Sequence, residues 1–166
     1  MKTSITRNNI SYSDFNHHLI NKERHMASEK KALIEGLNQD LANELGASIL
    51  YLYQTSTATG WDGEELREFL SAEITGEMQH AIFLAEKIAA LGGKPTTMPI
   101  QHKCPRDVKG MLKYDLKLER EAIEGYRQRA IQAEEAGEVG LKLKLEELIV
   151  DETGHAEQID RILRGM

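Results

Sequence analysis

Apolar residues recur at steps of three and four positions along most of the chain, the spacing that places side chains on one face of an α-helix. The pattern predicts four long helices, over residues 28–57, 62–91, 107–137 and 138–163. The inward face of the first reads Leu37, Leu41, Glu44, Ser48, Tyr51 and Thr55, and that of the second reads Leu66, Leu70, Ile74, Glu77, Ala81, Leu84 and Ile88. Each of these faces therefore carries a Glu where a helix of a globular protein normally places an apolar residue.

The connections between the helices predict how they are arranged. Tight turns follow the first and third helices, so each forms an antiparallel hairpin with its successor. The segment "GGKPTTMPIQHKCPRD" at 92–107 holds all three prolines and is irregular. A helix of about 28 residues is roughly 42 Å long, and about 15 extended residues reach roughly 50 Å. We therefore expect an all-α, ferritin-like four-helix bundle with one long crossover between helices two and three.

Candidate capping residues precede three of the predicted helices. The segment before the first helix lacks a helical pattern. Ser28 and Asp107 can cap the first and third helices, and Asp62 with Glu65 resembles a capping box for the second. Residues 1–27 show no helical period, so we expect an N-terminal extension, a flexible arm or a short surface helix, ahead of a bundle domain at 28–166. Metal binding by the histidines of this extension, or an interaction role for its slightly basic composition, are the alternatives. These histidines are His17, His18 and His25.

Composition narrows the class of protein without naming a function. A chain of 166 residues with 40% hydrophobic and 29% charged residues fits one globular domain. No stretch approaches the roughly 20 apolar residues of a membrane span. Cys104 is the only cysteine, so no internal disulfide forms and a cytoplasmic location is expected. The net charge of -6 argues against a nucleic-acid-binding surface and is compatible with attracting cations.

The two hairpins are related by an internal repeat. A shift of 75 positions pairs Leu37 with Leu112, Asp40 with Asp115, Glu44 with Glu119, Tyr51 with Tyr126, Leu70 with Leu145, Glu77 with Glu152 and His80 with His155. The motif "EMQH" at 77–80 therefore has a counterpart, "ETGH" at 152–155. A single Glu precedes each motif by 33 residues, and these are Glu44 and Glu119.

This set of six side chains predicts a two-metal site. Glu and His at positions i and i+3 project from the same helix face, so both can reach one ion. The repeat brings four carboxylates and two imidazoles into one bundle, and buried carboxylates are costly unless they are protonated or neutralised by cations. Oxygen and imidazole ligands without thiolate suit iron or manganese rather than a structural zinc site. The expected ligands are Glu44, Glu77, His80, Glu119, Glu152 and His155.

Neighbouring positions on the inward faces suggest supporting roles. Asp40 and Asp115 lie one turn before Glu44 and Glu119, where they could accept the second ring N–H of the ligand histidines. Tyr51 and Tyr126 lie two turns after the same glutamates. They could hydrogen-bond to ligand carboxylates or supply an electron, and the alternative is that both simply fill the core.

Four segments, "LNQDLANELGASILYLY", "EITGEMQHAIFLAEKIAALGGKP", "YDLKLEREAI" and "LIVDETGHAEQIDRIL", resemble the four helices of bacterioferritins. The resemblance covers residues 33–164. It implies that Glu77 and Glu152 bridge two irons, that Glu44 with His80 and Glu119 with His155 are the terminal ligands, and that Tyr51 lies beside the centre.

The resemblance also implies a function. It is iron storage and detoxification through ferroxidase activity, in which Fe(II) is oxidised by O2 or H2O2 and Fe(III) mineral is deposited inside a hollow homo-oligomeric shell. A di-iron or di-manganese enzyme that consumes peroxide without storage, similar to rubrerythrin or manganese catalase, is one alternative. A DNA-protecting mini-ferritin is another, which the acidic charge disfavours.

Met78 lies about 100° round the helix from Glu77, off the ligand face. It belongs to an apolar stripe with Ile82, Ala85 and Ala89, and a similar stripe on the first helix contains Leu45, Ile49 and Leu52. Such stripes suit a two-fold dimer, where in bacterioferritins a methionine from each subunit binds a haem. The chain ends eleven residues after His155, without a fifth helix, so we expect a dodecamer rather than a 24-mer. His102 and Cys104 in the crossover are further possible metal ligands.

Overall fold

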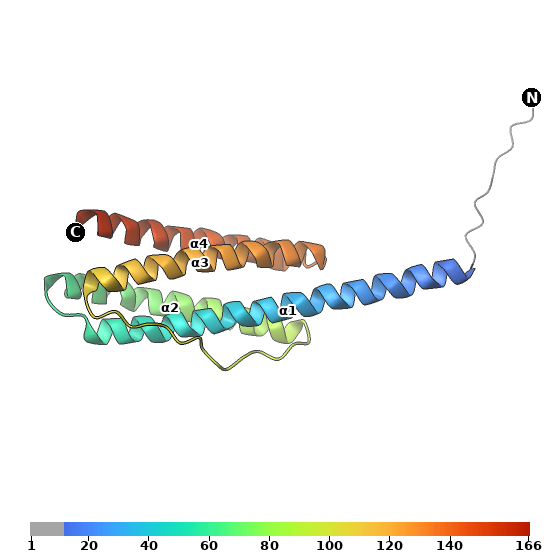
Figure 1. Cartoon of the computed structure of the whole chain (residues 1–166), viewed down its shortest axis with the longest axis horizontal. Coiled ribbons are helices and arrows are strands. Elements are labelled where there is room, and N and C mark those ends of the chain that lie inside the picture. Colours follow the sequence, from blue (N-terminus) through green and yellow to red (C-terminus); the bar gives the residue numbers. More distant parts are fainter. Residues whose placement is uncertain (1–11) are drawn as a thin grey trace, which may run out of the picture.

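The protein is a four-helix bundle, seen in a computed structural model that describes the backbone of residues 12–166 and the side chains of Lys22 and of residues from 24 onward. The helices are α1 (Tyr12–Thr57), α2 (Trp61–Ala90), α3 (Val108–Glu135) and α4 (Val139–Gly165). Helix α1 packs on α2, α3 packs on α4, and the two hairpins meet along α1 and α3. Helices α2 and α3 run in the same direction (Figure 1), which confirms the long crossover.

Helices α2 and α3 begin in different ways, α3 after a side-chain cap and α2 after a glycine. The Asp107 side chain accepts a hydrogen bond from the Gly110 N–H at 2.8 Å, which confirms it as the cap of α3. The predicted capping box of α2 is wrong, because Asp62 already lies inside the helix and no side chain caps it. Gly60 precedes the helix instead, with a φ of 86° that favours glycine.

Helix α1 begins at Tyr12, so the expected start at Ser28 is wrong. Residues 12–27 contain no glycine or proline that would end a helix. They lack an apolar period because this part of α1 projects beyond the other three helices and has no core to face (Figure 1). His17 and His18 lie outside the described side chains, and the exposed His25 lies 2.9 Å from Glu29. The separate extension over residues 1–27 stays a prediction.

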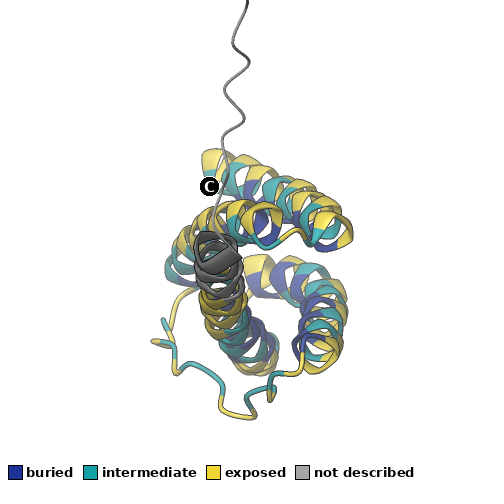
Figure 2. Ribbon diagram, turned by 90° about the vertical axis from the view of Figure 1, so that its right-hand side faces the viewer, coloured by how far each residue is buried: buried dark blue, intermediate teal, exposed yellow. Residues whose placement is uncertain are grey.

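The interior of the bundle contains two hydrophobic clusters, and buried polar residues lie between and within them. One cluster contains Leu37, Leu41, Leu84, Ile88, Tyr126, Leu145 and Leu148. The other contains Leu50, Tyr51, Leu66, Leu70, Leu112, Leu116 and Ile159. The buried polar and charged residues are Asp40, Glu44, Ser48, Gln54, Glu77, His80, Asp115, Glu119 and Glu152. Buried positions line the inner faces of the helices (Figure 2).

The crossover is attached to the side of α1. The Ile100 N–H donates to the Ala42 carbonyl at 2.9 Å. Nearer α2, the Asn38 side chain accepts a hydrogen bond from the Thr96 N–H at 2.7 Å and donates to the Lys94 carbonyl at 3.2 Å. Within residues 12–166, none of the helices has an apolar stretch long enough to cross a membrane.

Candidate metal centre

The fold brings the six predicted ligand residues into two adjacent groups at the middle of the bundle. One group contains Glu44, Glu77, His80 and Glu152, and the other contains Glu77, Glu119, Glu152 and His155. Within each group the potential ligand atoms lie within 4.8 Å of one another. Glu77 and Glu152 belong to both groups, so their carboxylates lie where a bridge between two ions would be.

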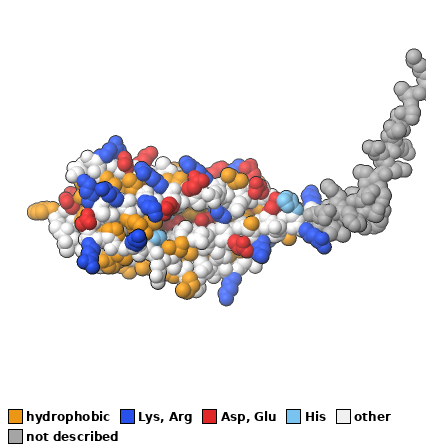
Figure 3. Space-filling view, viewed as in Figure 1, with side chains coloured by type: hydrophobic (Ala, Val, Ile, Leu, Met, Phe, Trp, Pro, Cys, Tyr) orange, Lys and Arg blue, Asp and Glu red, His pale blue; other side chains and the backbone are white. Residues whose placement is uncertain are grey.

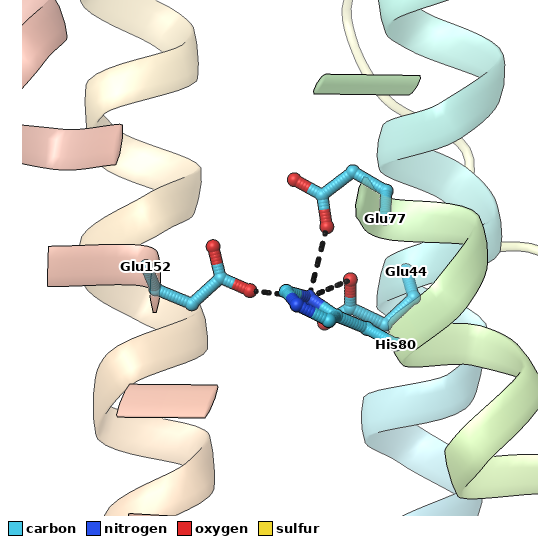
Figure 4. Close-up of side chains that lie close together, drawn as sticks. All are labelled: Glu44, Glu77, His80 and Glu152. Carbon is cyan, nitrogen blue, oxygen red and sulfur yellow. Dashed lines mark ion pairs between the residues drawn. The ribbon is translucent and has the colours of Figure 1, made fainter. Parts of the chain in front are cut away.

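His80 shows how three helices contribute to the first group (Figure 4). Its Nδ1 atom lies 2.9 Å from Glu152 Oε1 of α4, 3.6 Å from Glu77 Oε2 of α2 and 3.8 Å from Glu44 Oε2 of α1. Because one ring nitrogen faces all three carboxylates, an ion at their centre would replace a proton on that nitrogen.

His155 presents the same ring atom to the second group. Its Nδ1 lies 3.1 Å from Glu152 Oε2 and 3.9 Å from Glu119 Oε2. Both histidines therefore place Nδ1 toward the centre and Nε2 away from it, as the internal repeat requires.

In the absence of metal ions, bound protons neutralise the negative charge of the buried carboxylates. Burial, together with Glu44, raises the pKa of Glu77 well above its usual range, and burial with Glu152 does the same for Glu119. Burial alone would raise the pKa of Glu152 also, but His155 and His80 lower it to about 2. Burial opposes protonation of the histidines, yet contacts with Glu152 and other carboxylates raise the pKa of His80 to about 12 and of His155 to about 10. Protons thus occupy the positions where divalent cations would otherwise compensate the charge.

Unpartnered atoms at the centre fit a metal ion. His80 Nδ1 and Glu152 Oε1 are buried and have no hydrogen-bond partner of acceptable geometry. Buried polar atoms are normally hydrogen-bonded, so atoms of this kind point to a ligand. A set of carboxylate oxygens and imidazole nitrogens without thiolate suits iron or manganese.

The two predicted tyrosines connect the hairpins through the ligand carboxylates. The Tyr51 hydroxyl of α1 donates to Glu119 of α3, and the Tyr126 hydroxyl of α3 donates to Glu44 of α1. Both tyrosines are buried, and burial raises their pKa well above the usual range, so both hydroxyls stay protonated as donors. Glu44 and Glu119 are thereby each oriented by a tyrosine of the opposite hairpin.

The predicted role of Asp40 and Asp115 is wrong, because neither contacts a histidine. Asp40 Oδ2 lies 3.4 Å from Arg129 Nε, and Asp115 Oδ1 accepts a hydrogen bond from Gln54 Nε2 at 2.7 Å. Gln54 and Arg129 occupy equivalent positions of the repeat, so each Asp pairs with the same position of the other hairpin.

The histidines contact two further carboxylates that the sequence pattern does not predict. His155 Nε2 lies 2.9 Å from Glu73 Oε2, and His80 Nε2 lies 3.8 Å from Asp151 Oδ2. The repeat gives no signal for either acidic residue, because Leu148 is the counterpart of Glu73 and Gly76 that of Asp151. The only available signal for Glu73 is its position one turn before Glu77 on the same helix.

A substitution of Asp115 tests the cost of its burial. Burial raises its pKa from 3.8 to about 7, although the Gln54 hydrogen bond lowers it. The folded protein therefore keeps this proton to higher pH than the unfolded chain does, and its stability falls as the pH rises between these values. Asp115→Asn should raise the free energy of unfolding of the metal-free protein at pH 8 by at most roughly 4 kcal/mol, which thermal unfolding detects as a higher midpoint. At pH 4 the midpoint should change little. An equal shift at both pH values would show that the effect is not the ionisation of Asp115.

A cavity of about 260 Å³ leads from the surface to the carboxylates. Glu44, Glu77, Glu119 and Glu152 all line it, together with Ile100, Gln101 and His102 of the crossover. Figure 3 shows the face that carries α1, α3 and the crossover, where the surface is hollowed between the two helices. The centre is thus accessible to ions from this side of the subunit.

Comparisons with known proteins agree with this architecture. Residues 34–166 match the ferritin-like domain family. The bacterioferritin of Brucella melitensis biotype 1 is 30% identical over 136 residues, which are 81% of this chain and 84% of the relative. The chain is a bacterioferritin-like member of the ferritin family.

Two solved structures of ferritin-family proteins resemble this bacterioferritin-like chain. One is a ferritin-like, diiron-carboxylate protein from Bacillus anthracis, with a TM-score of 0.80, 45% identity and coverage of 81% of this chain and 97% of the other. Another is the bacterioferritin of Desulfovibrio desulfuricans, which has a diiron site, with a TM-score of 0.77, 29% identity and coverage of 84% and 82%. Together with the carboxylate–histidine groups, these similarities support an iron-storage or di-iron function for the bacterioferritin-like chain.

Met78 lies outside the centre, as the sequence predicts. Its side chain is 40% exposed, whereas that of the adjacent Glu77 is only 2% exposed. Ile49, Leu52 and Ile82 are exposed as well. These four residues, Ile49, Leu52, Met78 and Ile82, are called the apolar stripe below.

Proposed function

We propose that this bacterioferritin-like protein stores iron and oxidises Fe(II) at a two-ion site within each subunit. The observation that supports it is the pair of ligand groups that share Glu77 and Glu152. Shared carboxylates hold two cations close together and compensate their charge, which favours transfer of one electron from each ion to the same oxidant.

The oxidation balances in either of two ways. Two Fe(II) ions give up two electrons, and H2O2 takes both with two protons to become two waters. Alternatively, O2 takes both electrons with two protons and becomes H2O2. The Fe(III) product is then deposited as mineral in the interior of the shell. The metal ions supply the redox chemistry, and the protein supplies their positions.

The side chains around the ions hold them and release protons. Glu44 with His80 would hold one ion and Glu119 with His155 the other, and Glu77 and Glu152 would contribute to both. Uptake of the cations displaces the protons that Glu77 and Glu119 hold in the metal-free protein, because burial raises the pKa of both carboxyls. Tyr51 and Tyr126 keep the terminal carboxylates in position through their hydroxyls, and Tyr51 is also a candidate electron donor.

The assembly we propose is a homo-oligomer built from two-fold dimers. The apolar stripe is exposed on the single subunit, and a second copy placed on it would bury all four side chains. Met78 from both copies would then face a shared haem. A Soret band in freshly purified protein that disappears in Met78→Leu supports haem, and native mass distinguishes a dodecamer from a 24-mer.

The test of storage is to add many Fe(II) ions per subunit in air. A storage protein should form an iron mineral core that stays in solution with the shell, seen by electron microscopy and by co-elution of iron with protein. Rapid turnover of peroxide with only two metal ions retained per subunit would instead favour a peroxide-consuming enzyme.

A further inference from the structure

The end of the bundle opposite the projecting part of α1 carries the chain's only tryptophan, Trp61. The turn between α1 and α2, the start of α3 and the end of α4 lie together at this end (Figure 1). Trp61 is the first residue of α2, and its side chain is 94% exposed. Tryptophan is highly buried on average in folded proteins and is enriched among the residues that anchor interfaces. Its exposure on the single subunit therefore indicates a contact surface.

A groove lies beside Trp61 at the same end. It has a volume of about 690 Å³, and α2 contributes Trp61 and Asp62 to its lining, while Arg106 and Lys109 line it from the start of α3. An adjoining cavity of about 70 Å³ is lined mainly by apolar side chains, which are those of Leu66, Val108, Leu112, Ile162 and Met166. Charged edges next to an apolar surface suit the amphipathic indole ring.

The starts of α2 and α3 carry opposite charges at this groove. Three exposed acidic residues lie on the first turns of α2, and three exposed basic residues lie around the start of α3. They are Asp62, Glu65 and Glu68, and Arg106, Lys109 and Lys113. Arg67 pairs with Glu64, and none of these six forms an ion pair with another side chain that the structure describes. The two sets are thus complementary in charge and available to a partner.

A second copy of this chain fits both observations. A copy rotated about an axis at this end would place its acidic α2 start against the basic α3 start of its neighbour, with Trp61 at the neighbour's groove. Such a contact is heterologous, because each copy contributes a different surface on each side, and it can close into a ring. The apolar stripe cannot build a shell alone, because a two-fold contact closes with two copies.

We infer that Trp61 anchors the contact that joins two-fold dimers of this chain into a larger closed shell, with its indole ring in the groove of a neighbouring copy. This inference rests on the proposed homo-oligomer. Removal of an anchoring tryptophan weakens an interface by at least roughly 30-fold. Because the contact would recur at every copy around the axis, its loss should separate the shell into dimers.

The experiment is sedimentation velocity of the full-length protein at low protein concentration, with Co(II) titration of the same samples. Trp61→Ala removes the anchor, and the double variant Arg106→Glu/Lys109→Glu makes both sides of the contact acidic. Both should sediment as dimers and still bind two Co(II) ions per subunit, which shows that the bundle is intact. The matched control is Lys117→Glu, an exposed lysine two turns farther along α3, which should keep the wild-type mass.

Tryptophan fluorescence measures the same contact directly, because Trp61 is the only tryptophan. In the wild-type shell, Trp61 should be shielded from quenching by acrylamide. In the double charge variant, which retains Trp61, acrylamide should quench it as readily as in the unfolded chain. The shift from shielded to accessible accompanies the loss of mass only if the ring lies in the contact.

The outcomes separate this inference from the two-ion site. If Trp61→Ala or the double charge variant keeps the wild-type mass, or if acrylamide quenches Trp61 freely in the wild-type protein, the inference fails. A wild-type protein that is itself a dimer or a monomer also overturns it, together with the proposed shell. The two-ion site fails only if the wild-type protein does not bind two Co(II) ions per subunit. Dimeric variants with intact metal binding, and a shielded Trp61 in the wild type, support the contact.

Discussion

Replacing Glu77 with Gln should abolish the binding of both metal ions in each subunit and lower the rate of Fe(II) oxidation by at least about 100-fold. Glu77 belongs to both ligand groups, so the loss of its charge affects both positions at once. The variant should nevertheless fold. Burial raises the pKa of Glu77 well above its usual range, so the metal-free protein already holds this carboxyl as a neutral acid, and Gln is a neutral side chain of the same shape.

Equilibrium titration with Co(II) measures this effect, with the metal-free thermal midpoint as the test of folding. Glu86→Gln is a matched control, because Glu86 is an exposed glutamate on the same helix. It should bind two ions per subunit and oxidise Fe(II) as the wild type does. If Glu77→Gln still bound two ions with unchanged affinity, Glu77 would not be a shared ligand.

Replacing Glu73 with Gln should weaken one of the two metal positions and spare the other. Glu73 Oε2 lies 2.9 Å from Nε2 of His155, within reach of the ring N–H that would remain when Nδ1 binds an ion. A carboxylate in this position orients the ring and makes Nδ1 a stronger ligand. Loss of such a partner typically lowers metal affinity by about 10- to 100-fold. A Co(II) titration that is steep for two ions in the wild type should therefore separate into one tight and one weak step.

The corresponding change next to His80 provides the comparison. Asp151 Oδ2 lies 3.8 Å from His80 Nε2 and its side chain is 54% exposed, so solvent screens the contact. Asp151→Asn should leave both binding steps nearly unchanged. If the two variants weakened binding equally, the partners of the two histidines would be equivalent, and the difference between these distances would have no functional consequence.

The sequence was sufficient to predict the fold and to bring together the residues of the candidate centre. The Pro-rich segment was long enough to require a crossover, and the shift of 75 positions matched two Glu-x-x-His motifs and two single glutamates. These predictions succeeded because helix geometry fixes which residues share a face. The same periodicity placed Tyr51 and Tyr126 on the inward faces, and of the two roles left open for them the structure shows hydrogen bonds to Glu119 and Glu44.

The contacts around the centre were harder to predict, because they depend on which helices lie opposite each other. Asp40 and Asp115 are on the inward face, but their side chains contact Arg129 and Gln54 of the other hairpin instead of a histidine. The repeat does not indicate a role for Glu73, because its counterpart, Leu148, is apolar. The start of α1 at Tyr12 was missed for a different reason, since a helix that projects beyond the bundle needs no apolar face.

The two halves of the centre are similar but not equivalent. Arg129 places a positive charge beside Asp40 in one half, whereas the neutral Gln54 lies beside Asp115 in the other. Burial raises the pKa of both aspartates to about 7, although Arg129 opposes the rise at Asp40. Together with the unequal partners of His80 and His155, this difference gives the two halves of the centre different surroundings.

We propose that each subunit holds two ions and oxidises them together, and the burst of Fe(II) oxidation distinguishes this from oxidation at a single ion. Metal-free protein is mixed with increasing amounts of Fe(II) in air, and the amplitude of the rapid oxidation phase is measured. We expect this amplitude to saturate at two Fe(II) per subunit and to disappear in Glu77→Gln. Saturation at one Fe(II) per subunit, or a burst that persists in Glu77→Gln, would contradict it.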